Sequence, residues 1–354
     1  MSLTSYDPNL AKVSISSPPK LVPFETIEKT LLSLLKTPHK IFSSQQRAFQ
    51  LATEQSKSQG LTSSLPIQTA GQPPQPTLKS GDGAQVCIKT GYVKGGNVIV
   101  SKVAAGGGNA SNTGAVFVLD QLSLRLSAIL CDEGLLTEVR TAAACVYASK
   151  FALGEQKLKK IQKLGIVGGG VQAVWQLRFL ATITDTRKII VKTRSKESAE
   201  AFFERMNTST YLPDREWEFE HYDGSGEKFT GCQLIHTLTP SREPVFMLDD
   251  IDIEKSDFLH ITAVGSDSPG KCELDSALIQ KADVLLCDSI SQSKERGEFQ
   301  RTDEFDTDKL IEIGSFADNE MRSIESSSTI TIFDSSGLAF QDVEMANLIF
   351  SAMN

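Results

Sequence analysis

The spacing of hydrophobic and polar positions changes near residue 154, and this change divides the chain into two regions. In the first region, a helical pattern at 24–36 precedes four runs with strand spacing and a second helix at 137–153. Thr137 is the expected N-cap of that helix, since a threonine side chain can accept a hydrogen bond from the first turn. Residues 57–83 are rich in Ser, Gly, Gln and Pro, which predicts a long loop. The strand-like runs are 84–89, 97–104, 114–119 and 127–131.

Beyond Gly154, strand-like runs alternate with helical stretches. This alternation is typical of a parallel, doubly wound sheet and predicts a Rossmann domain over residues 154–324. A further strand at 329–333 and a helix to the end are assigned, with residues 1–153, to the other domain. The expected fold class is α/β, with the Rossmann sheet inserted into a discontinuous α+β domain for substrate binding and dimerisation, made of residues 1–153 and 325–354. The Rossmann runs are 163–167, 188–193, 217–222, 232–238, 257–263 and 283–288.

A glycine-rich loop follows the first strand of the second region. The pattern is Gly168-x-Gly170-x-x-Ala173, and a helical pattern comes after it. The first glycine permits a tight turn, the second lets the backbone approach a pyrophosphate, and a small third residue allows close packing of helix and strand. This order predicts a dinucleotide site. The cofactor-binding residues expected around it are Gly168, Gly170, Val171, Gln172 and Ala173, with Thr239 and Val264 farther along the chain.

The end of the second Rossmann strand bears on the choice between NAD(H) and NADP(H). An Asp or Glu there would bind the ribose 2′-hydroxyl, but this strand ends in Lys192-Thr193-Arg194-Ser195-Lys196. Arginine offers a planar fork of donors that suits a phosphate. We therefore expect NADP(H) rather than NAD(H), with Thr193, Arg194, Ser195 and Lys196 in contact with it. The alternative is that Arg194 and Lys196 simply open an exposed helix.

Composition narrows the class of protein. The 354 residues carry a net charge of −8, which argues against a general nucleic-acid surface. No signal-peptide pattern and no apolar run of about 20 residues is evident. We expect a cytoplasmic protein without nucleic-acid or membrane partners.

Cysteines and histidines give no metal-binding pattern. The six cysteines include no CxxC pair, and several lie in apolar runs, so buried thiols in a reducing compartment are expected. The four histidines lack paired spacing, and His236 and His260 lie inside strand-like runs. Both are interpreted as core histidines, and no metal is expected.

Four segments in order resemble the ornithine cyclodeaminase/mu-crystallin family over roughly residues 40–350. They are 136–144 (Leu-Thr-Glu-Val-Arg-Thr-Ala-Ala-Ala), the Gly168 loop with Gln172, 265–274 (Gly-Ser-Asp-Ser-Pro-Gly-Lys-Cys-Glu-Leu), and 333–339 with Asp342. The third segment is closer to the cyclodeaminase and alanine dehydrogenase branches than to the ketimine reductases. The resemblance implies a homodimer with the nicotinamide between the domains. Members of the family oxidise an amino acid to an imine or reduce an imine, and some are mainly binding or lens proteins.

The resemblance also implies roles for individual residues. Arg140, Lys102 and Arg47 would hold the substrate α-carboxylate, and Asp267 would be the catalytic carboxylate that takes a proton from the substrate amine. Lys89 is a rival for the lysine role, although its spacing to the following motif does not match. The alternatives are surface or ion-paired cations, and a turn-capping role for Asp267.

The last implied segment is the turn near the C-terminus. Ser336 and Gly337 would line the substrate, and a simple turn glycine is an equal alternative for Gly337.

These observations predict an NAD(P)-dependent enzyme that oxidises the Cα–N bond of a small L-amino acid. The product would be proline plus ammonia from ornithine, or a keto acid in an alanine dehydrogenase type of reaction. The alternatives are an NADPH-dependent reductase of cyclic ketimines and a non-enzymatic NADP(H)-binding protein.

Overall fold

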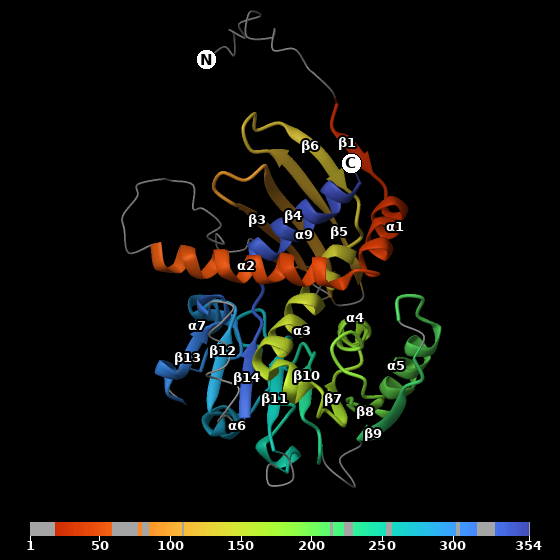
Figure 1. Ribbon diagram of the computed structural model, residues 1–354, viewed down its shortest axis with the longest axis vertical. Coiled ribbons are helices and arrows are strands. Elements are labelled where there is room, and N and C mark those ends of the chain that lie inside the picture. Colours follow the sequence, from red (N-terminus) through yellow and green to blue (C-terminus); the bar gives the residue numbers. More distant parts are fainter. Residues whose placement is uncertain are drawn as a thin grey trace, which may run out of the picture.

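Two β-sheets lie one above the other in the computed structural model, with helices between them (Figure 1). The structure describes residues 18–58, 77–79, 85–107, 110–212, 215–222, 229–252, 257–301, 305–316 and 330–353. Most of the predicted loop 57–83 lies outside these residues, although Thr77–Lys79 forms a strand.

The first sheet is built mainly from the first region of the chain. Its order is β1-β6-β5-β4-β3-β2, antiparallel except for the β1–β6 pair. Its strands are β1 (Lys20–Val22), β2 (Thr77–Lys79), β3 (Gln85–Tyr92), β4 (Val98–Gly107), β5 (Ala110–Asp120) and β6 (Leu126–Leu130). Its helices are α1 (Phe24–Leu34), α2 (Pro38–Ser58) and α3 (Leu135–Leu158).

The second sheet is parallel throughout, in the order β13-β12-β14-β11-β10-β7-β8-β9. The expected α/β class with a parallel Rossmann-like sheet is therefore confirmed. Its strands are β7 (Lys163–Val167), β8 (Lys188–Lys192), β9 (Glu218–Tyr222), β10 (Leu234–Thr237), β11 (Leu259–Ala263), β12 (Val284–Cys287), β13 (Leu310–Glu312) and β14 (Ile330–Asp334). Its helices are α4 (Val171–Leu180), α5 (Lys196–Thr208), α6 (Ser276–Lys281) and α7 (Ile290–Arg296).

The position of β14 corrects the domain boundary expected at residue 325. This strand lies between β11 and β12, with Ile332 opposite Ile261 and Leu285. All of its residues are buried, as is typical of a central parallel strand covered on both faces. Only the last helix, α9 (Ala339–Ala352), returns to the first sheet, where it packs on β3, β4 and α2 (Figure 1).

Helix α3 differs from its expected bounds. It begins at Leu135, with Gly134 as N-cap at φ 85°, so the expected N-cap at Thr137 is wrong. The Asp132 side chain instead accepts a hydrogen bond from the Leu136 amide at 3.0 Å. The helical assignment continues past Gly154, which has non-helical angles (φ 64°, ψ 168°) and kinks the helix there.

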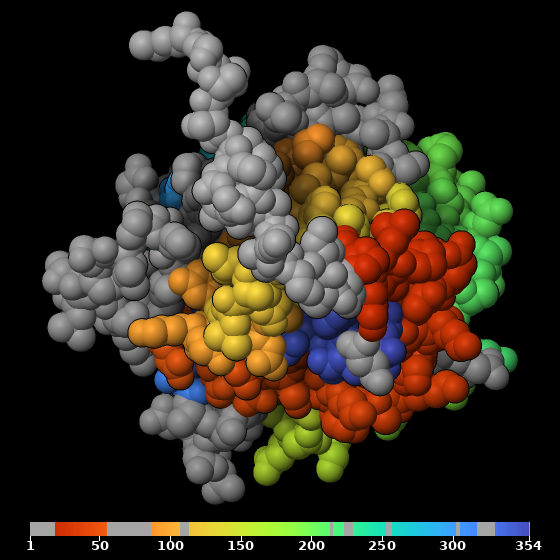
Figure 2. All heavy atoms as spheres, turned by 90° about the horizontal axis from the view of Figure 1, so that it is seen from above, coloured from red at the N-terminus to blue at the C-terminus, as the bar shows by residue number. Residues whose placement is uncertain are grey.

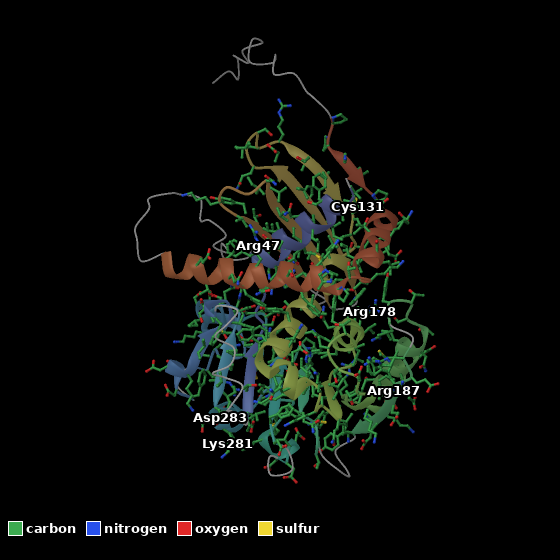
Figure 3. The ribbon with its side chains drawn as sticks, in the orientation of Figure 1. Arg47, Cys131, Arg178, Arg187, Lys281 and Asp283 are labelled. Atoms are coloured by element: carbon green, nitrogen blue, oxygen red, sulfur yellow. The ribbon has the colours of Figure 1, made fainter. Side chains whose placement is uncertain are left out.

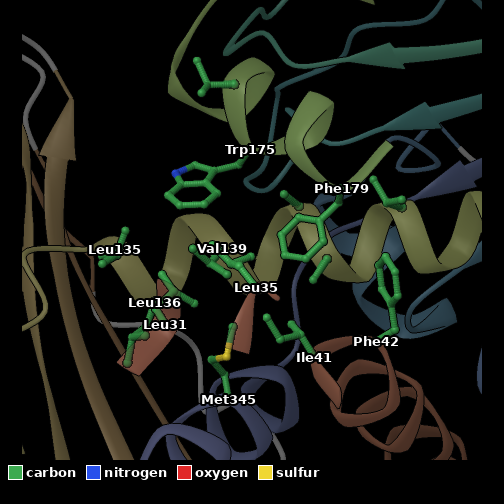
Figure 4. Close-up of a cluster of buried hydrophobic side chains, with 14 of the residues drawn as sticks. Leu31, Leu35, Ile41, Phe42, Leu135, Leu136, Val139, Trp175, Phe179 and Met345 are labelled. Atoms are coloured by element: carbon green, nitrogen blue, oxygen red, sulfur yellow. The ribbon is translucent and has the colours of Figure 1, made fainter. Parts of the chain in front are cut away.

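A shared hydrophobic core joins the two sheets. Trp175 and Phe179 of α4 pack with residues of α1, α2, α3 and α9 (Figure 4). Each large apolar side chain buried in this way contributes about 1.5–3 kcal/mol. The labelled members of this cluster are Leu31, Leu35, Ile41, Phe42, Leu135, Leu136, Val139, Trp175, Phe179 and Met345.

Most of the cysteines are buried free thiols, as the apolar runs around them predict. All six cysteines lie in the described residues and none forms a disulfide; Cys145, Cys232, Cys272 and Cys287 are buried. No helix among the described residues is long and apolar enough to cross a membrane.

Candidate active site

A buried ion cluster joins the first sheet to α3 and α9. Asp342 Oδ1 accepts a hydrogen bond from Lys102 Nζ at 2.8 Å and another from Arg140 Nε at 3.0 Å. Arg140 Nη1 also donates to Gln341 Oε1 at 2.7 Å. All four side chains are buried. The structure thus brings together two of the three predicted carboxylate-binding cations, around an aspartate from the C-terminal helix.

Lys89 belongs to the same cluster. It lies directly opposite Lys102 in the β3–β4 register, so the two side chains share one face of the sheet. Its Nζ lies 3.4 Å from the Gly337 carbonyl oxygen. The spacing to the following motif favoured Lys102 over Lys89 for the lysine role, whereas strand pairing places both in this cluster.

The cluster perturbs the pKa values of its own members. Burial would raise the pKa of Asp342, but Arg140, Lys102 and Lys89 together lower it to about 2. Burial, with the neighbouring Arg140 and Lys102, lowers the pKa of Lys89 to about 7. Burial also lowers the pKa of Lys102, against the opposing effect of Asp342. Asp342 is therefore ionised at neutral pH, while Lys89 titrates there.

The turn after β14 carries Ser336 and Gly337 to this cluster. Asp288, which follows β12, accepts hydrogen bonds from Ser336 Oγ at 2.7 Å and from the Gly337 amide at 2.6 Å. Gly337 has φ +83°, and a Cβ built on it would lie 3.2 Å from Lys89 Nζ and 3.3 Å from Arg140 Nη1. Glycine is thus favoured at 337 by the positive φ, and it also lies next to Lys89 and Arg140. Sequence analysis missed Asp288, since its only signal was its place just after a strand.

Arg47 lies apart from these contacts. It is on α2 (Figure 3), its side chain is 62% exposed, and its Nε lies 3.2 Å from Glu344 Oε1 on α9. Among the described residues, no contact links it to Lys102 or Arg140. Its predicted place beside these two cations is therefore not seen in this structure.

Asp267 lies in the loop after β11. Its side chain is 53% exposed, and Lys271 Nζ lies 2.7 Å from its Oδ1. In the described part of the chain, no contact joins it to the ion cluster. Its exposure leaves it accessible to a ligand at the carboxyl end of the sheet.

The glycine loop has the geometry that a dinucleotide needs. Gly168 has φ +101°, and a Cβ there would lie 2.9 Å from Thr239 Cγ2. A Cβ at Gly170 would meet nothing within 4 Å, so the backbone of the α4 N-terminus is open to an approaching group. Val171 is partly exposed and Ala173 is fully buried against the sheet. Gln172 donates to the Glu138 carbonyl at 3.2 Å, and its buried Oε1 has no partner among the described residues.

Glu273 ties together the loops that carry Thr239 and Val264. Its carboxylate accepts hydrogen bonds from Thr239 N and Oγ1, Thr237 Oγ1 and Gly265 N. Burial raises the pKa of Glu273, and these bonds oppose that effect. The carboxyl ends of β10 and β11 are thereby held side by side, where ligands bind in doubly wound sheets. Glu273 is a second residue that sequence analysis missed.

Arg194 and Lys196, at the predicted 2′-phosphate corner, are both exposed. Arg194 is exposed, and no ion pair holds it among the described residues. Ser195 caps α5 through Ser198 N, and Thr193 Oγ1 contacts the Ser195 carbonyl and His221 Nε2. Lys196 lies 3.9 Å from Glu200, an exposed pair within one helix. The structure thus combines helix capping with an accessible arginine.

His236 and His260 lie in the core, as expected. His236 contacts Ser149 and Gln176, and His260 contacts Thr262 and Thr331. Burial lowers the pKa of each histidine to about 3, so both are neutral. Within the described ranges, no group of three or more His, Cys, Asp or Glu residues could hold a metal ion.

Comparison with known proteins places this architecture in a family. The model of the ornithine cyclodeaminase/mu-crystallin family matches residues 100–354. An uncharacterized cyclodeaminase of Sinorhizobium fredii is 30% identical over 276 residues, which cover 75% of this chain and 80% of that protein. The alanine dehydrogenase of Archaeoglobus fulgidus is 29% identical over 240 residues, covering 67% and 69% of the two chains.

Solved structures show the same fold. The iminosuccinate reductase of Paracoccus denitrificans in complex with NAD+ aligns with a TM-score of 0.72 at 24% identity, covering 94% of this chain and 96% of that one. A lysine cyclodeaminase aligns with a TM-score of 0.73 at 20% identity, covering 95% and 92%. The fold combines a six-stranded, mainly antiparallel sheet with an eight-stranded parallel sheet of the Rossmann type. This combination defines the chain as a two-sheet α/β protein. Within that class, the chain belongs to the ornithine cyclodeaminase/mu-crystallin family.

Proposed function

We propose that this protein is a nicotinamide-dependent enzyme that acts on the Cα–N bond of a small L-amino acid. The observation that carries the proposal is the buried cluster of Lys102 and Arg140 at the carboxyl end of β14. Such cations bind a carboxylate through charge-assisted hydrogen bonds and fix the substrate Cα in one orientation.

The glycine loop fits a nicotinamide dinucleotide. The open face at Gly170 and the unpartnered Oε1 of Gln172 both leave polar groups for a ligand. When bound, the nicotinamide would accept or return the hydride of the substrate Cα. The residues that would hold the dinucleotide are Gly168, Gly170, Val171, Gln172, Ala173, Thr193, Arg194, Ser195, Lys196, Thr239 and Val264.

Other residues of this chain would bind the substrate and accept its proton. Arg140 and Lys102 would hold the carboxylate, and the Ser336–Gly337 turn would line the substrate beside them. Asp267 would accept a proton from the substrate amine. In a cyclodeaminase a distal amine then closes the ring, whereas in a dehydrogenase water hydrolyses the imine. The archaeal alanine dehydrogenase solved as a dimer supports a homodimer for this chain.

A reductase of imino acids is the second candidate. Relatives include iminosuccinate reductase and Δ1-pyrroline-2-carboxylate reductase. The same ion cluster would then hold the carboxylate of an imine, and the reaction would run in the opposite direction. A non-enzymatic NADP(H)-binding role would leave the cluster without a substrate.

Assays with ornithine, lysine, alanine and pyrroline-2-carboxylate, each with both cofactors, separate these functions. We expect turnover with at least one of them, and Arg140→Ala should reduce it more than tenfold because a charge-assisted bond is lost. The variant should still bind cofactor. Unchanged kcat and KM in Arg140→Ala would show that the carboxylate binds elsewhere.

Asp267→Asn tests the proposed base. The variant keeps the shape and removes the proton acceptor, so turnover should fall about 10²–10⁴-fold while cofactor still binds. Lys271→Met removes the ion pair but keeps the carboxylate, so it is the matched control. A loss of less than about threefold in Asp267→Asn would favour a turn-capping role, since asparagine caps nearly as well.

A further inference from the structure

The ion cluster contains a carboxylate oxygen that its cations do not use. Lys102 and Arg140 both donate to Oδ1 of Asp342, whereas Oδ2 is buried and has no hydrogen-bond partner among the described residues. Burying an ionised oxygen without a donor is costly. Asp342 is therefore prepared to accept one more hydrogen bond.

The cluster also contains a cation, Lys89, that makes no ion pair with a carboxylate among the described residues. Among the described residues, the hydrogen bond of Lys89 is a long one, to the Gly337 carbonyl. Asp342 is already engaged by the other two cations, so Lys89 adds positive charge that the cluster leaves unbalanced. An anion placed beside it would restore the balance.

We propose that Lys89 Nζ and Asp342 Oδ2 form a matched pair that binds the two charged ends of an α-amino acid. Lys89 would bind the α-carboxylate together with Arg140 and Lys102, and Asp342 would accept a hydrogen bond from the α-nitrogen. This inference rests on the proposed function and names the binding residues within that site.

The positions of the two groups support the pair. Lys89 lies opposite Lys102 on adjacent strands, and Lys102 Nζ lies 2.8 Å from Asp342. Lys89 and Asp342 are therefore both neighbours of Lys102 on this face of the sheet. At Gly337, a Cβ would lie 3.2 Å from Lys89 Nζ and 3.3 Å from Arg140 Nη1, so the bare glycine leaves this space between the two cations open.

The two ends differ in their chemistry. Asp342 is ionised at neutral pH, since its pKa is about 2, and it acts as a hydrogen-bond acceptor, distinct from the base Asp267. The pKa of Lys89 is lowered to about 7, so an arriving carboxylate draws a proton onto Lys89. The charged or titratable groups around Lys89 are Arg140 on α3, Lys102 on β4, Asp342 on α9, Cys87 on β3 and Asp288 after β12.

Ligands that lack the nitrogen test each half of the pair. Isobutyrate is L-alanine with a methyl group in place of the ammonium, and cyclopentanecarboxylate is L-proline with a methylene group in place of the nitrogen. Each ligand is titrated calorimetrically into the full chain saturated with the tighter-binding of NAD+ and NADP+. We expect the wild-type protein to bind the amino acid at least tenfold more tightly than its nitrogen-free partner.

The variants assign the two ends. Lys89→Met should weaken all four ligands at least tenfold, whereas Lys94→Met, an exposed lysine in the following turn, should change none of them more than twofold. Asp342→Asn should weaken the amino acids tenfold or more and their nitrogen-free partners less than threefold. Isobutyrate affinity should fall between pH 6 and 8.5 in the wild type and stay level in Lys89→Met.

The proposed pair is rejected if Lys89→Met binds the ligands with wild-type affinity. It is also rejected if folded Asp342→Asn loses affinity equally for the amino acids and for their nitrogen-free partners. If Asp342→Asn does not fold, equal wild-type binding of L-alanine and isobutyrate, and of the proline pair, rejects the nitrogen half. A wild-type protein that binds none of the four ligands would instead contradict the proposed function itself.

Discussion

Three cations converge on Asp342, and each enters the protein interior at a cost. Removing a charge from water is unfavourable unless an opposite charge is close. Asp342 makes ion pairs with Lys102 and Arg140, whereas Lys89 makes none among the described residues. The sequence position of each residue gives no sign of this difference.

Lys89 should therefore lower the stability of the protein at neutral pH. Its pKa is about 7 in the folded chain and near 10.5 in the unfolded one, so between these values the unfolded chain binds more protons and stability rises with pH. Lys89→Met should raise the free energy of unfolding at pH 7 by about 1 kcal/mol or more. The difference should shrink as the pH approaches 10.5. Urea unfolding at pH 7, 8.5 and 10 measures this, and a constant difference would contradict the lowered pKa.

The exposed Arg194 gives a prediction about the cofactor. We expect NADPH to bind at least several-fold more tightly than NADH, because a guanidinium fork can bind the 2′-phosphate and no carboxylate is present at this strand end. Arg194→Asp should shift the preference toward NADH. Fluorescence titration with both cofactors measures the affinities, and an unchanged melting temperature serves as the control. Equal affinities in the wild type would reject the 2′-phosphate assignment.

At the scale of elements, the β7–α4 unit has the structure that its local sequence predicts. The strand runs from Lys163 to Val167, as expected from its apolar run, and the glycines follow at once. Gly168 has a positive φ, while Gly170 has φ −74° and open space where a Cβ would lie. The two glycines therefore have different reasons to lack a side chain.

This difference predicts different effects of alanine. Gly170→Ala should leave the melting temperature within about 1 °C of the wild type, since its Cβ meets nothing, and should weaken dinucleotide binding at least tenfold. Gly168→Ala should lower stability by about 1–3 kcal/mol because alanine would be strained at the positive φ of this position. Thermal unfolding and cofactor titration of both variants measure this. Dinucleotide binding unchanged in Gly170→Ala would show that the backbone approach is not needed.

At the scale of the whole molecule, the six-stranded sheet forms one end of the structure, where β5, β6 and α1 reach the surface (Figure 2). Three leucines there are well exposed, Leu122 at 95%, Leu21 at 69% and Leu124 at 65%. Only a contiguous apolar patch marks a surface that associates, so single exposed leucines need a direct test of such a role. If the homodimer proposed above uses this end of the molecule, these leucines are the residues at which to test the contact.

The proposed homodimer predicts the molecular mass of the protein in solution. Sedimentation should give twice the 38.5 kDa of one chain. Leu21→Glu combined with Leu122→Glu should shift the protein toward the monomer with its circular dichroism unchanged. Met247→Glu, an exposed apolar residue between β10 and β11, is the matched control and should leave the mass unchanged. A wild-type monomer, or a double variant that stays dimeric, would place the contact elsewhere.

The sequence by itself determined the features that depend on neighbouring residues. Strand runs and the glycine loop were enough to predict the Rossmann sheet, because local periodicity reports which faces are buried. The four ordered motifs gave the resemblance to the family. Arg140 and Lys102 were selected through the family resemblance instead, and Arg140 lies within the segment 136–144 that carries it.

Only the tertiary structure decided which distant residues meet. Arg140 and Asp342 are 202 positions apart, and β14 pairs with β11 and β12 although it follows them by a long stretch of chain. Lys89 became part of the site through strand register, while Arg47 paired with Glu344. Periodicity carries no information on which strands pair or which charges share a carboxylate, because these depend on distances set by the packing of the whole fold.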